Sequence, residues 1–439
     1  MWPRTADVPN VLWDQRSRAA HAYDQTLFST RSDSMMIHRP LEGIRVVDFG
    51  QFVAAPGASQ SLVSLGADVI KVEPREGDWV RSGTSFGEAI LRTYNRGKRS
   101  IALDLKDSRG LGVAERLVSD ADVVIQNMRP GAMEALGLGP DRVNVLNPRA
   151  IYATVSGFGL RGPSRHRPGL DIAAQAESGL MSITGELGGT PLRVGTTIVD
   201  AATAHVLTEA ILAALLERER FGRVAAVEVS LLEVALHLQS ADWTGYSVTG
   251  SSPCRRGNGQ PGVAPAADLI ETSDGYIVLS GYSAQHWPRL CEVLGRVDLA
   301  GDPRFADNEA RVAHREELLT ELSVALGGRT SEECVQLLAS NGIVVGAVRT
   351  YDQVRESDDV IAGEMFTCGE HFDGSAFDVV QTPFRLGGDS DRTARRVPRL
   401  GEHSGEIVTG IGYSAAELDE LVEAGVLLIE EPSSVGTPA

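Results

Sequence analysis

The sequence predicts an α/β protein, in which a large domain with a Rossmann-like parallel sheet is joined to a smaller α+β domain. Between residues 41 and 230, short apolar runs typical of buried strands alternate with helical stretches. Alternation at this spacing is typical of a parallel sheet with helices on both faces. The length of 439 residues also exceeds what one core supports, because single cores stop growing near ~250–300 residues.

The expected elements of the large domain follow one another along the chain. Residues 44–49 suit a buried strand, and the helical stretch after them ends at Gly66. Pro74 stops a second strand, because proline cannot donate a hydrogen bond to the ladder. The remaining elements are that strand at 67–73, strands at 100–105, 121–125 and 150–157, and helices at 108–119 and 199–220, with Asp200 at the beginning of the last helix.

The pattern of strand and helix signals changes after residue 230, which predicts a second domain. A loop rich in glycine and proline at 253–265 precedes a hairpin-like segment at 267–281. Helical segments follow near 284–294 and 315–326, and strand character returns at 342–348. We therefore expect an N-terminal extension at 1–40, a large domain formed by 41–229 and 341–439, and a small domain at 230–340.

Composition argues against several classes of protein. A net charge of −18 disfavours nucleic acid as a partner, although a local basic lining can still hold an anion. Four cysteines lack metal-ligand spacing, so we expect free thiols and no metal. The longest apolar runs fall short of the ~20 residues of a membrane span, and the N-terminus lacks a signal-peptide pattern. We expect a cytoplasmic protein with no membrane partner.

Six segments in fixed order resemble class III CoA-transferases, the family of formyl-CoA transferase, carnitine CoA-transferase and the alpha-methylacyl-CoA racemases. They are LEGIRVVD at 41–48, LGADVIKVE at 65–73, NRGKRSIALDL at 95–105, NMRPG at 127–131, VSLLE at 229–233 and LGEH at 400–403. The resemblance implies an enzyme that moves coenzyme A from an acyl-CoA donor to a carboxylic acid acceptor. It also implies a homodimer whose two chains interlock like links, and in some members a related second chain.

The resemblance implies that Asp200 is the catalytic nucleophile. In the family, an aspartate near the start of a long helix attacks the thioester, and the matching stretch here is 194–202. The reaction then passes through an aspartyl anhydride and an aspartyl-CoA thioester, which divides one difficult exchange into easier steps. The structural alternative is that Asp200 only caps its helix.

Asp171 is the second acid that the resemblance singles out, either as a site residue or as a structural hydrogen-bond acceptor. Racemases of the family carry Gly-His-Asp here, but this chain has Leu170 at the histidine position. Leucine cannot exchange a proton, so racemase chemistry is disfavoured. Formyl-CoA transferases carry a tyrosine at this position, so Leu170 points towards a more apolar acyl group.

The family's coenzyme A contacts, matched position by position, predict a binding site for this polyanion. Basic side chains and backbone amides at helix starts are the groups that bind phosphates. The matched residues are Val53, Ala54, Arg75, Leu103, Lys106, Asn127, Met128, Arg129 and Arg167, together with Asp171. The segment Asn258, Gly259 and Gln260 resembles the family's glycine-rich lid, although an ordinary linker would also fit.

Two other readings of the sequence lead to different functions. An NAD-dependent oxidoreductase needs GxGxxG after the first strand, and residues 49–55 do not supply it. A non-catalytic CoA-binding subunit of a two-chain transferase stays open, although an intact Asp200 favours activity. The sequence leaves the acyl donor and the acceptor acid open.

Overall fold

The structure is a computed structural model that describes residues 39–259, 265–280, 286–386 and 395–430. Nearly all of the expected N-terminal extension, the lid residue Gln260 and the tail after 430 lie outside the described residues.

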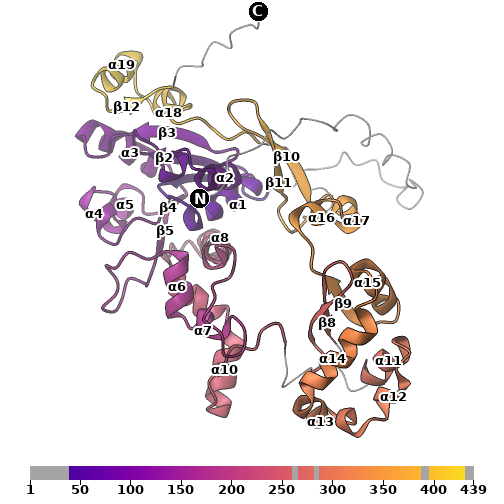
Figure 1. The fold of residues 1–439 in the computed structure, drawn as a ribbon. Coiled ribbons are helices and arrows are strands. Elements are labelled where there is room, and N and C mark those ends of the chain that lie inside the picture. Colours follow the sequence, from indigo (N-terminus) through magenta and orange to yellow (C-terminus); the bar gives the residue numbers. More distant parts are fainter. Residues whose placement is uncertain (1–38, 260–264, 281–285, 387–394, 431–439) are drawn as a thin grey trace, which may run out of the picture.

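Within the described residues, the large domain is built on a sheet with the strand order β12-β3-β2-β1-β4-β5-β6 (Figure 1). Neighbouring strands are parallel except for β12, which runs antiparallel to β3. The predicted α/β fold with a parallel central sheet is confirmed. The strands are β1 (Arg45–Asp48), β2 (Asp68–Glu73), β3 (Arg99–Leu103), β4 (Val123–Gln126), β5 (Ile151–Ser156), β6 (Val227–Ser230) and β12 (Leu427–Leu428).

Helices cover both faces of this sheet because strand side chains alternate between faces, and both sets are apolar. In β1, Val46 points into the core under α1 and α8, whereas Val47 points into the opposite core. The first face carries α1 (Ala54–Ser64), α8 (Ile198–Phe221) and α9 (Leu231–His237), and the second carries α3 (Ser108–Ser119), α4 (Ala132–Ala135), α5 (Pro140–Leu146), α18 (Ser404–Gly410) and α19 (Ala415–Glu423).

Helix α8 is the longest of the described helices and packs along α1. By length and composition alone it could cross a membrane, but half of its most apolar window is buried within the fold. Helix α8 also contacts α6 (Asp171–Glu177), which packs against α7 (Leu180–Ile183). Helix α2 (Ser85–Tyr94) packs against α1 and the 3-10 turn at Trp79–Arg81.

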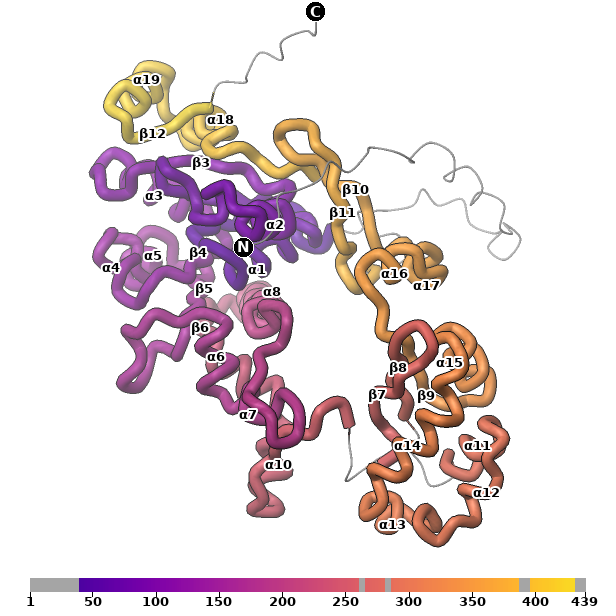
Figure 2. Tube along the Cα trace, in the orientation of Figure 1, coloured from indigo at the N-terminus to yellow at the C-terminus, as the bar shows by residue number. Residues whose placement is uncertain are grey.

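A smaller unit has its own core, which runs from Ala266 to Val345 (Figure 2). The antiparallel strands β7 (Asp268–Glu271), β8 (Tyr276–Ser280) and β9 (Val344–Ala347) form its sheet. Its helices are α11 (His286–Val293), α12 (Val297–Ala300), α13 (Asn308–Ala313), α14 (Arg315–Leu326) and α15 (Ser331–Ala339), with a 3-10 turn at Pro303–Phe305. We expected a small domain at 230–340. The packing favours a later start and end, because α9 packs with the large core and β9 joins the small sheet.

The segments between the two cores include pieces that we did not expect from the sequence. The hairpin of β10 (Phe366–Glu370) and β11 (Ala376–Val380) follows α16 (Tyr351–Arg355) and α17 (Asp358–Ala362), between the two units (Figure 1). Helix α10 (Ser240–Thr249) projects from the large domain and has no buried residue. Its exposed side chains include Trp243, Tyr246 and Val248.

Candidate functional site

Two adjoining cavities lie at the carboxyl edge of the sheet, where ligands bind in open α/β folds. The first, of about 210 Å³, we call the inner chamber, and the second, of about 300 Å³, the outer chamber. Gln51 and Met128 line both chambers, so the two adjoin, and we call them together the groove. The inner chamber contains Asp200, Leu170, Leu231, Ser156, Phe52, Val53, Ala54, Asn127, Arg129 and Arg167, and the outer one contains Glu73, Arg75, Glu76, Leu103, Asp104, Leu105, Lys106 and Leu136.

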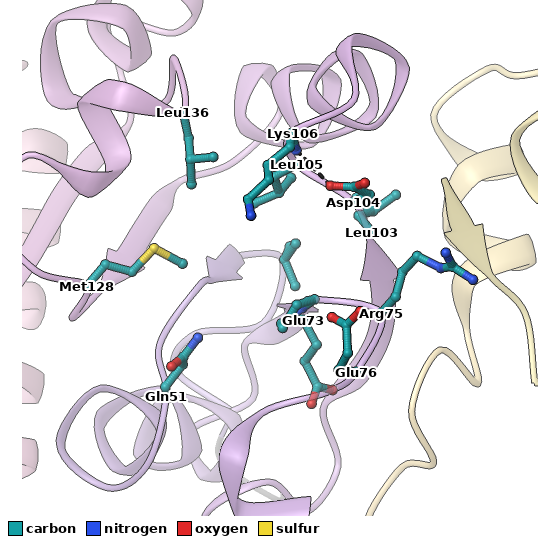
Figure 3. Close-up of a pocket in the computed structure, with 12 residues that line it drawn as sticks. Gln51, Glu73, Arg75, Glu76, Leu103, Asp104, Leu105, Lys106, Met128 and Leu136 are labelled. Carbon is teal, nitrogen blue, oxygen red and sulfur yellow. Dashed lines mark hydrogen bonds between the residues drawn. The ribbon is translucent and has the colours of Figure 1, made fainter. Parts of the chain in front are cut away.

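Lys106 is the cation that faces the outer chamber most directly. Figure 3 shows its side chain pointing into the cavity towards Met128, whereas Arg75 points away towards the C-terminal segment. A side chain at Gly425 would indeed meet the Arg75 guanidinium at 3.2 Å. Lys106 and Arg129 have no ion pair to another described residue, which leaves their charges for an anionic ligand.

Asp200 lies in the first turn of α8 and is the carboxylate of the inner chamber. It is only 5% exposed, and its Oδ2 atom has no hydrogen-bond partner among the described residues. Burial and, to a smaller extent, the nearby charge of Asp171 together raise the pKa of Asp200 to about 7. A buried, unpaired carboxylate with a shifted pKa in a cavity is typical of a functional site.

Asp171 does not line either chamber and makes its hydrogen bonds inside the protein. Its Oδ2 accepts from the backbone N–H of Val199 at 2.8 Å and from that of Asp200 at 3.2 Å. Its Oδ1 accepts from Gln175 Nε2 at 2.6 Å, and Gln175 in turn accepts from Val194 N at 2.9 Å. Asp171 thus satisfies two of the free amides at the start of α8.

These contacts bear on the idea that Asp200 is only a helix cap. The residue before α8, Thr197, makes no side-chain capping bond, and Asp171 supplies the acceptor from outside the helix. The Asp200 carboxylate is therefore left for the chamber. The Tyr94 hydroxyl lies close enough that the charge of Asp200 helps to raise the pKa of the tyrosine, although burial is the larger cause.

Apolar groups surround much of the inner chamber. Leu170 is 60% exposed and lines it together with Leu231 and Phe52. Arg167, expected as a phosphate contact, lies in the same wall but pairs with Glu177 at 2.6 Å. Its guanidinium also lies 4.5 Å from the centre of the Phe158 ring.

The expected lid residues Asn258 and Gly259 do not line either chamber within the described chain. Their loop is held near α7 instead. Arg255 donates to the carbonyl of Ser182 at 3.1 Å, and Gly257 N donates to the carbonyl of Gly185 at 3.0 Å. A Cβ atom at Gly259 would collide with the Arg315 guanidinium, which pairs with Asp268.

Sequence reasoning missed several residues of the groove. Gln51, Ser156 and Leu231 follow the strands β1, β5 and β6 or end them. Tyr94, at the end of α2, lines neither chamber but lies near enough for the charge of Asp200 to raise its pKa. The first three could have been found by taking the residues at the carboxyl ends of parallel strands. No signal in the sequence points to Tyr94. Within the described ranges, no group of three or more His, Cys, Asp or Glu side chains gathers in a way that could hold a metal ion.

Comparisons with known proteins agree on one family. The model of CoA-transferase family III matches residues 41–404. A probable fatty acyl-CoA transferase of Mycobacterium tuberculosis is 39% identical over 83% of this chain and 96% of its own length. A succinate–glutarate CoA-transferase of Agrobacterium fabrum is 34% identical over 84% of this chain and 95% of its own length.

Solved structures give the same result at the level of the fold. A CaiB/BaiF family protein of Brucella suis superposes with a TM-score of 0.78 and 33% identity over 85% of this chain and all of its own. A crystal structure of the mycobacterial protein superposes with a TM-score of 0.75 and 38% identity, over 84% of this chain and 99% of its own.

Proposed function

We propose, since this chain belongs to CoA-transferase family III and is a CoA-transferase, that Asp200 is the nucleophile through which it transfers coenzyme A. The observation that carries the proposal is the buried Oδ2 of Asp200, which has no partner among the described residues and faces a groove with free cations further along. A carboxylate in that position can attack a thioester carbonyl held in the inner chamber.

The exchange is balanced without a metal or a redox partner. Asp200 attacks the acyl carbon of the donor, which gives a mixed anhydride and the CoA thiolate. The thiolate attacks the aspartyl carbonyl, which gives the aspartyl-CoA thioester and releases the first acid. The acceptor carboxylate attacks this thioester to form a second anhydride and free thiolate. The thiolate then attacks the new acyl carbon, which yields the new acyl-CoA and restores Asp200.

The groove has the chemistry that coenzyme A needs. We place the reacting thioester in the inner chamber beside Asp200 and the nucleotide end in the outer chamber, where Lys106 meets phosphate. Arg129 lines the inner chamber and serves the same ligand. Arg167 and Arg75 are secondary contacts, because one pairs with Glu177 and the other points away from the cavity.

Asp171 is part of this proposal as a positioning residue. It holds the backbone of Val199 and Asp200, and its negative charge favours the protonated form of Asp200. Racemase chemistry is not supported, since Leu170 occupies the wall where a second proton-transfer group is needed. The same leucine favours an apolar acyl group. The fatty acyl name of the mycobacterial relative agrees with this, whereas the Agrobacterium relative is named for dicarboxylates.

The interlocked homodimer and the lid are also proposals that rest on the family. Support for a partner comes from α10, whose exposed Trp243 and Tyr246 would be covered by another chain. The proposed lid comprises Asn258, Gly259 and Gln260, of which Gln260 lies outside the described residues. Asn258 and Gly259, whose loop is held near α7, would have to close over the inner chamber. The cytoplasmic location stays a prediction, and a net charge of −18 supports the absence of a nucleic-acid partner.

The decisive experiment is intact-protein and peptide mass spectrometry after incubation with a panel of acyl-CoA esters. We expect a covalent adduct on the peptide that contains Asp200, as the CoA thioester or as its hydroxylamine-trapped derivative. The acyl-CoA that gives the adduct identifies the donor class. Absence of any adduct across apolar and dicarboxylic donors, in a protein that turns over, would place the nucleophile elsewhere.

A further inference from the structure

Four ionisable side chains are buried beneath the loop after β1, whose Gln51 lines both chambers. Asp48 and Lys71 are 0% exposed, and Asp78 and Lys98 are 2% exposed. They come from the end of β1, from β2, from the segment before the Trp79–Arg81 turn, and from the residue before β3. Burying charges is costly, so such a cluster needs close pairing and is often retained for a reason other than stability.

The pair of Lys71 and Asp78 holds one side of this loop. Lys71 Nζ donates to Asp78 Oδ2 at 3.0 Å and to the carbonyl oxygen of Gly50 at 2.8 Å. The same Asp78 oxygen accepts from the backbone N–H of Phe52 at 3.3 Å. One ion pair therefore fixes two backbone groups of the residues 50–52.

The pair of Lys98 and Asp48 holds the two ends of residues 50–56, which comprise this loop and the first turn of α1. Lys98 Nζ donates to Asp48 Oδ2 and to the carbonyl oxygen of Pro56, each at 3.0 Å. Asp48 Oδ1 accepts from Gly50 N at 2.7 Å. The residues 50–56 are thus tied at both ends to charges that no described cavity reaches.

The loop needs such restraint because its backbone is strained. Phe52 has φ +67°, in the left-handed region that side chains other than glycine rarely adopt. On the groove side, Gln51 exchanges two hydrogen bonds with Asn127, each of 2.8 Å. Gln51 lines both chambers and Phe52 lines the inner one, so a relaxed loop would change the shape of the groove.

We propose that the buried pairs Lys71–Asp78 and Lys98–Asp48 position residues 50–56 so that the groove fits coenzyme A. These four side chains do not touch the reacting atoms and act through the loop. The inference rests on the proposed function, since it assumes that the groove is the coenzyme A site. It assigns a role to Asp48, Lys71 and Lys98, which lie in the motifs at 41–48, 65–73 and 95–105 and which the chemistry itself does not use.

The test separates positioning from stability by removing the charges singly and together. Lys71→Met leaves Asp78 buried without its cation, and Asp78→Asn leaves Lys71 without its anion, so both single variants should lose thermal stability. The double variant Lys71→Met with Asp78→Asn removes both charges, and we expect it to recover most of the melting temperature. It still lacks a donor for the Gly50 carbonyl, so its Kd for free CoA should be about tenfold weaker than that of the wild type.

Arg218→Met is the matched control. Arg218 is 3% exposed and pairs with Asp122 at 2.9 Å, but it lies at the other end of α8, 18 residues and roughly 27 Å from Asp200. Its loss should lower the melting temperature while the Kd for CoA, measured by calorimetry, stays unchanged.

The outcomes are distinct. A double variant that binds CoA within about twofold of the wild type, or an Arg218→Met variant that weakens by the same factor as the double, overturns the inference. If the double variant does not fold, Asp78→Asn is judged by the same criterion. A folded wild type that fails to bind CoA overturns the proposed function instead, and the two failures are therefore distinguishable.

Discussion

The amino and carboxyl edges of the central sheet both carry charged side chains, but they use them differently. At the amino edge, three arginines pair with carboxylates: Arg45 with Asp120 at 2.5 Å, Arg99 with Asp68 at 2.6 Å and Arg218 with Asp122 at 2.9 Å. At the carboxyl edge, Lys106, Arg129 and Asp200 have no such partner among the described residues.

The difference follows from what each edge has to do. Pairing satisfies charges locally and leaves nothing for a ligand, which suits an edge that only joins strands to helices. An edge that binds a polyanion needs unpaired cations and a carboxylate poised to react. The carboxyl edge also contains paired charges, Lys71–Asp78 and Lys98–Asp48, but these are buried behind the loop and support the groove from within.

The largest expected effect comes from Asp200, whose Oδ2 has no hydrogen-bond partner among the described residues. Asp200→Asn keeps the size of the side chain and removes the nucleophile, so CoA transfer should fall by more than about 1,000-fold. Binding of free CoA, which depends on the cations further along the groove, should change little. Steady-state kinetics measures the loss of transfer, and calorimetry measures CoA binding. Near wild-type turnover in this variant would show that the unpaired carboxylate of the carboxyl edge is not the nucleophile.

The pH dependence of transfer should report the same unpaired group. The pKa of Asp200 is raised to about 7, so at lower pH the nucleophile is protonated. We expect kcat/KM to fall about tenfold from pH 8 to pH 6. Asp171→Asn removes a like charge while its side-chain oxygen can still accept from Val199 N, so the acidic limb should move to lower pH. An acidic limb that stays at the same pH in this variant contradicts the assignment.

The stability of the fold should depend on pH in the opposite direction to the transfer rate, falling as pH rises. Because the pKa of Asp200 is higher in the folded chain than its ordinary value of 3.8, folding favours the protonated form. Ionisation therefore costs stability as pH rises from about 4 towards about 7, and the cost is fully present above that range. Asp200→Asn should raise the melting temperature at pH 8 and have little effect at pH 4. A stabilisation of equal size at both pH values would show that the cause is packing.

The sequence could predict which residues gather at the carboxyl edge but not the contacts that support them from within. Alternating strand and helix runs predicted a parallel sheet, whose strands end together at one edge. Val53, Lys106 and Asn127, which were matched to the family, line the chambers at that edge. The contacts of Lys71 with Gly50 and of Asp171 with Val199 join residues 21 and 28 positions apart. No local pattern encodes such pairings.

The parts of the fold that were missed have a similar cause. Strand β12 is only two residues long, and its antiparallel pairing with β3 joins the two ends of the large domain. In the hairpin β10–β11 only Gly369 and Val379 are buried, and the sequences FTCGE and AFDVV do not alternate apolar with polar residues, which is the pattern that predicts a half-buried strand.

A smaller effect is expected from the free cations of the carboxyl edge. Lys106→Met should weaken CoA binding by about tenfold, and Arg129→Met by a similar factor, since each removes a charge-assisted contact to phosphate. Stability should not fall, because neither cation has an ion pair to lose among the described residues. Calorimetric titration with CoA, repeated at high salt, measures the effect. Unchanged affinity in both variants would move the phosphates out of this groove.

A substitution in the lid loop tests whether the site extends beyond the carboxyl edge of the sheet. Gly259→Val is unsuitable, since its side chain would disturb the pair of Arg315 and Asp268. Gly257 has φ +61°, and Gly257→Ala penalises this backbone with only the flexible Glu186 side chain nearby. Poor closure should raise the ratio of acyl-CoA hydrolysis to transfer severalfold, with unchanged CoA affinity. An unchanged ratio would mark the loop as a linker.

The smallest effect is expected at the amino edge, where Arg99 gives the sharpest contrast with Lys106. Arg99 binds Asp68 through two hydrogen bonds, of 2.6 and 3.0 Å, but the pair is partly exposed. Arg99→Gln should therefore cost less than about 1 kcal/mol of unfolding free energy, because partly solvated pairs contribute little. Urea denaturation measures that cost. Transfer rate and CoA affinity should equal those of the wild type, since the residue lies at the opposite end of its strand from Leu103 and the outer chamber. A loss of CoA affinity in Arg99→Gln, as large as that in Lys106→Met, would show that the two edges are not functionally separate.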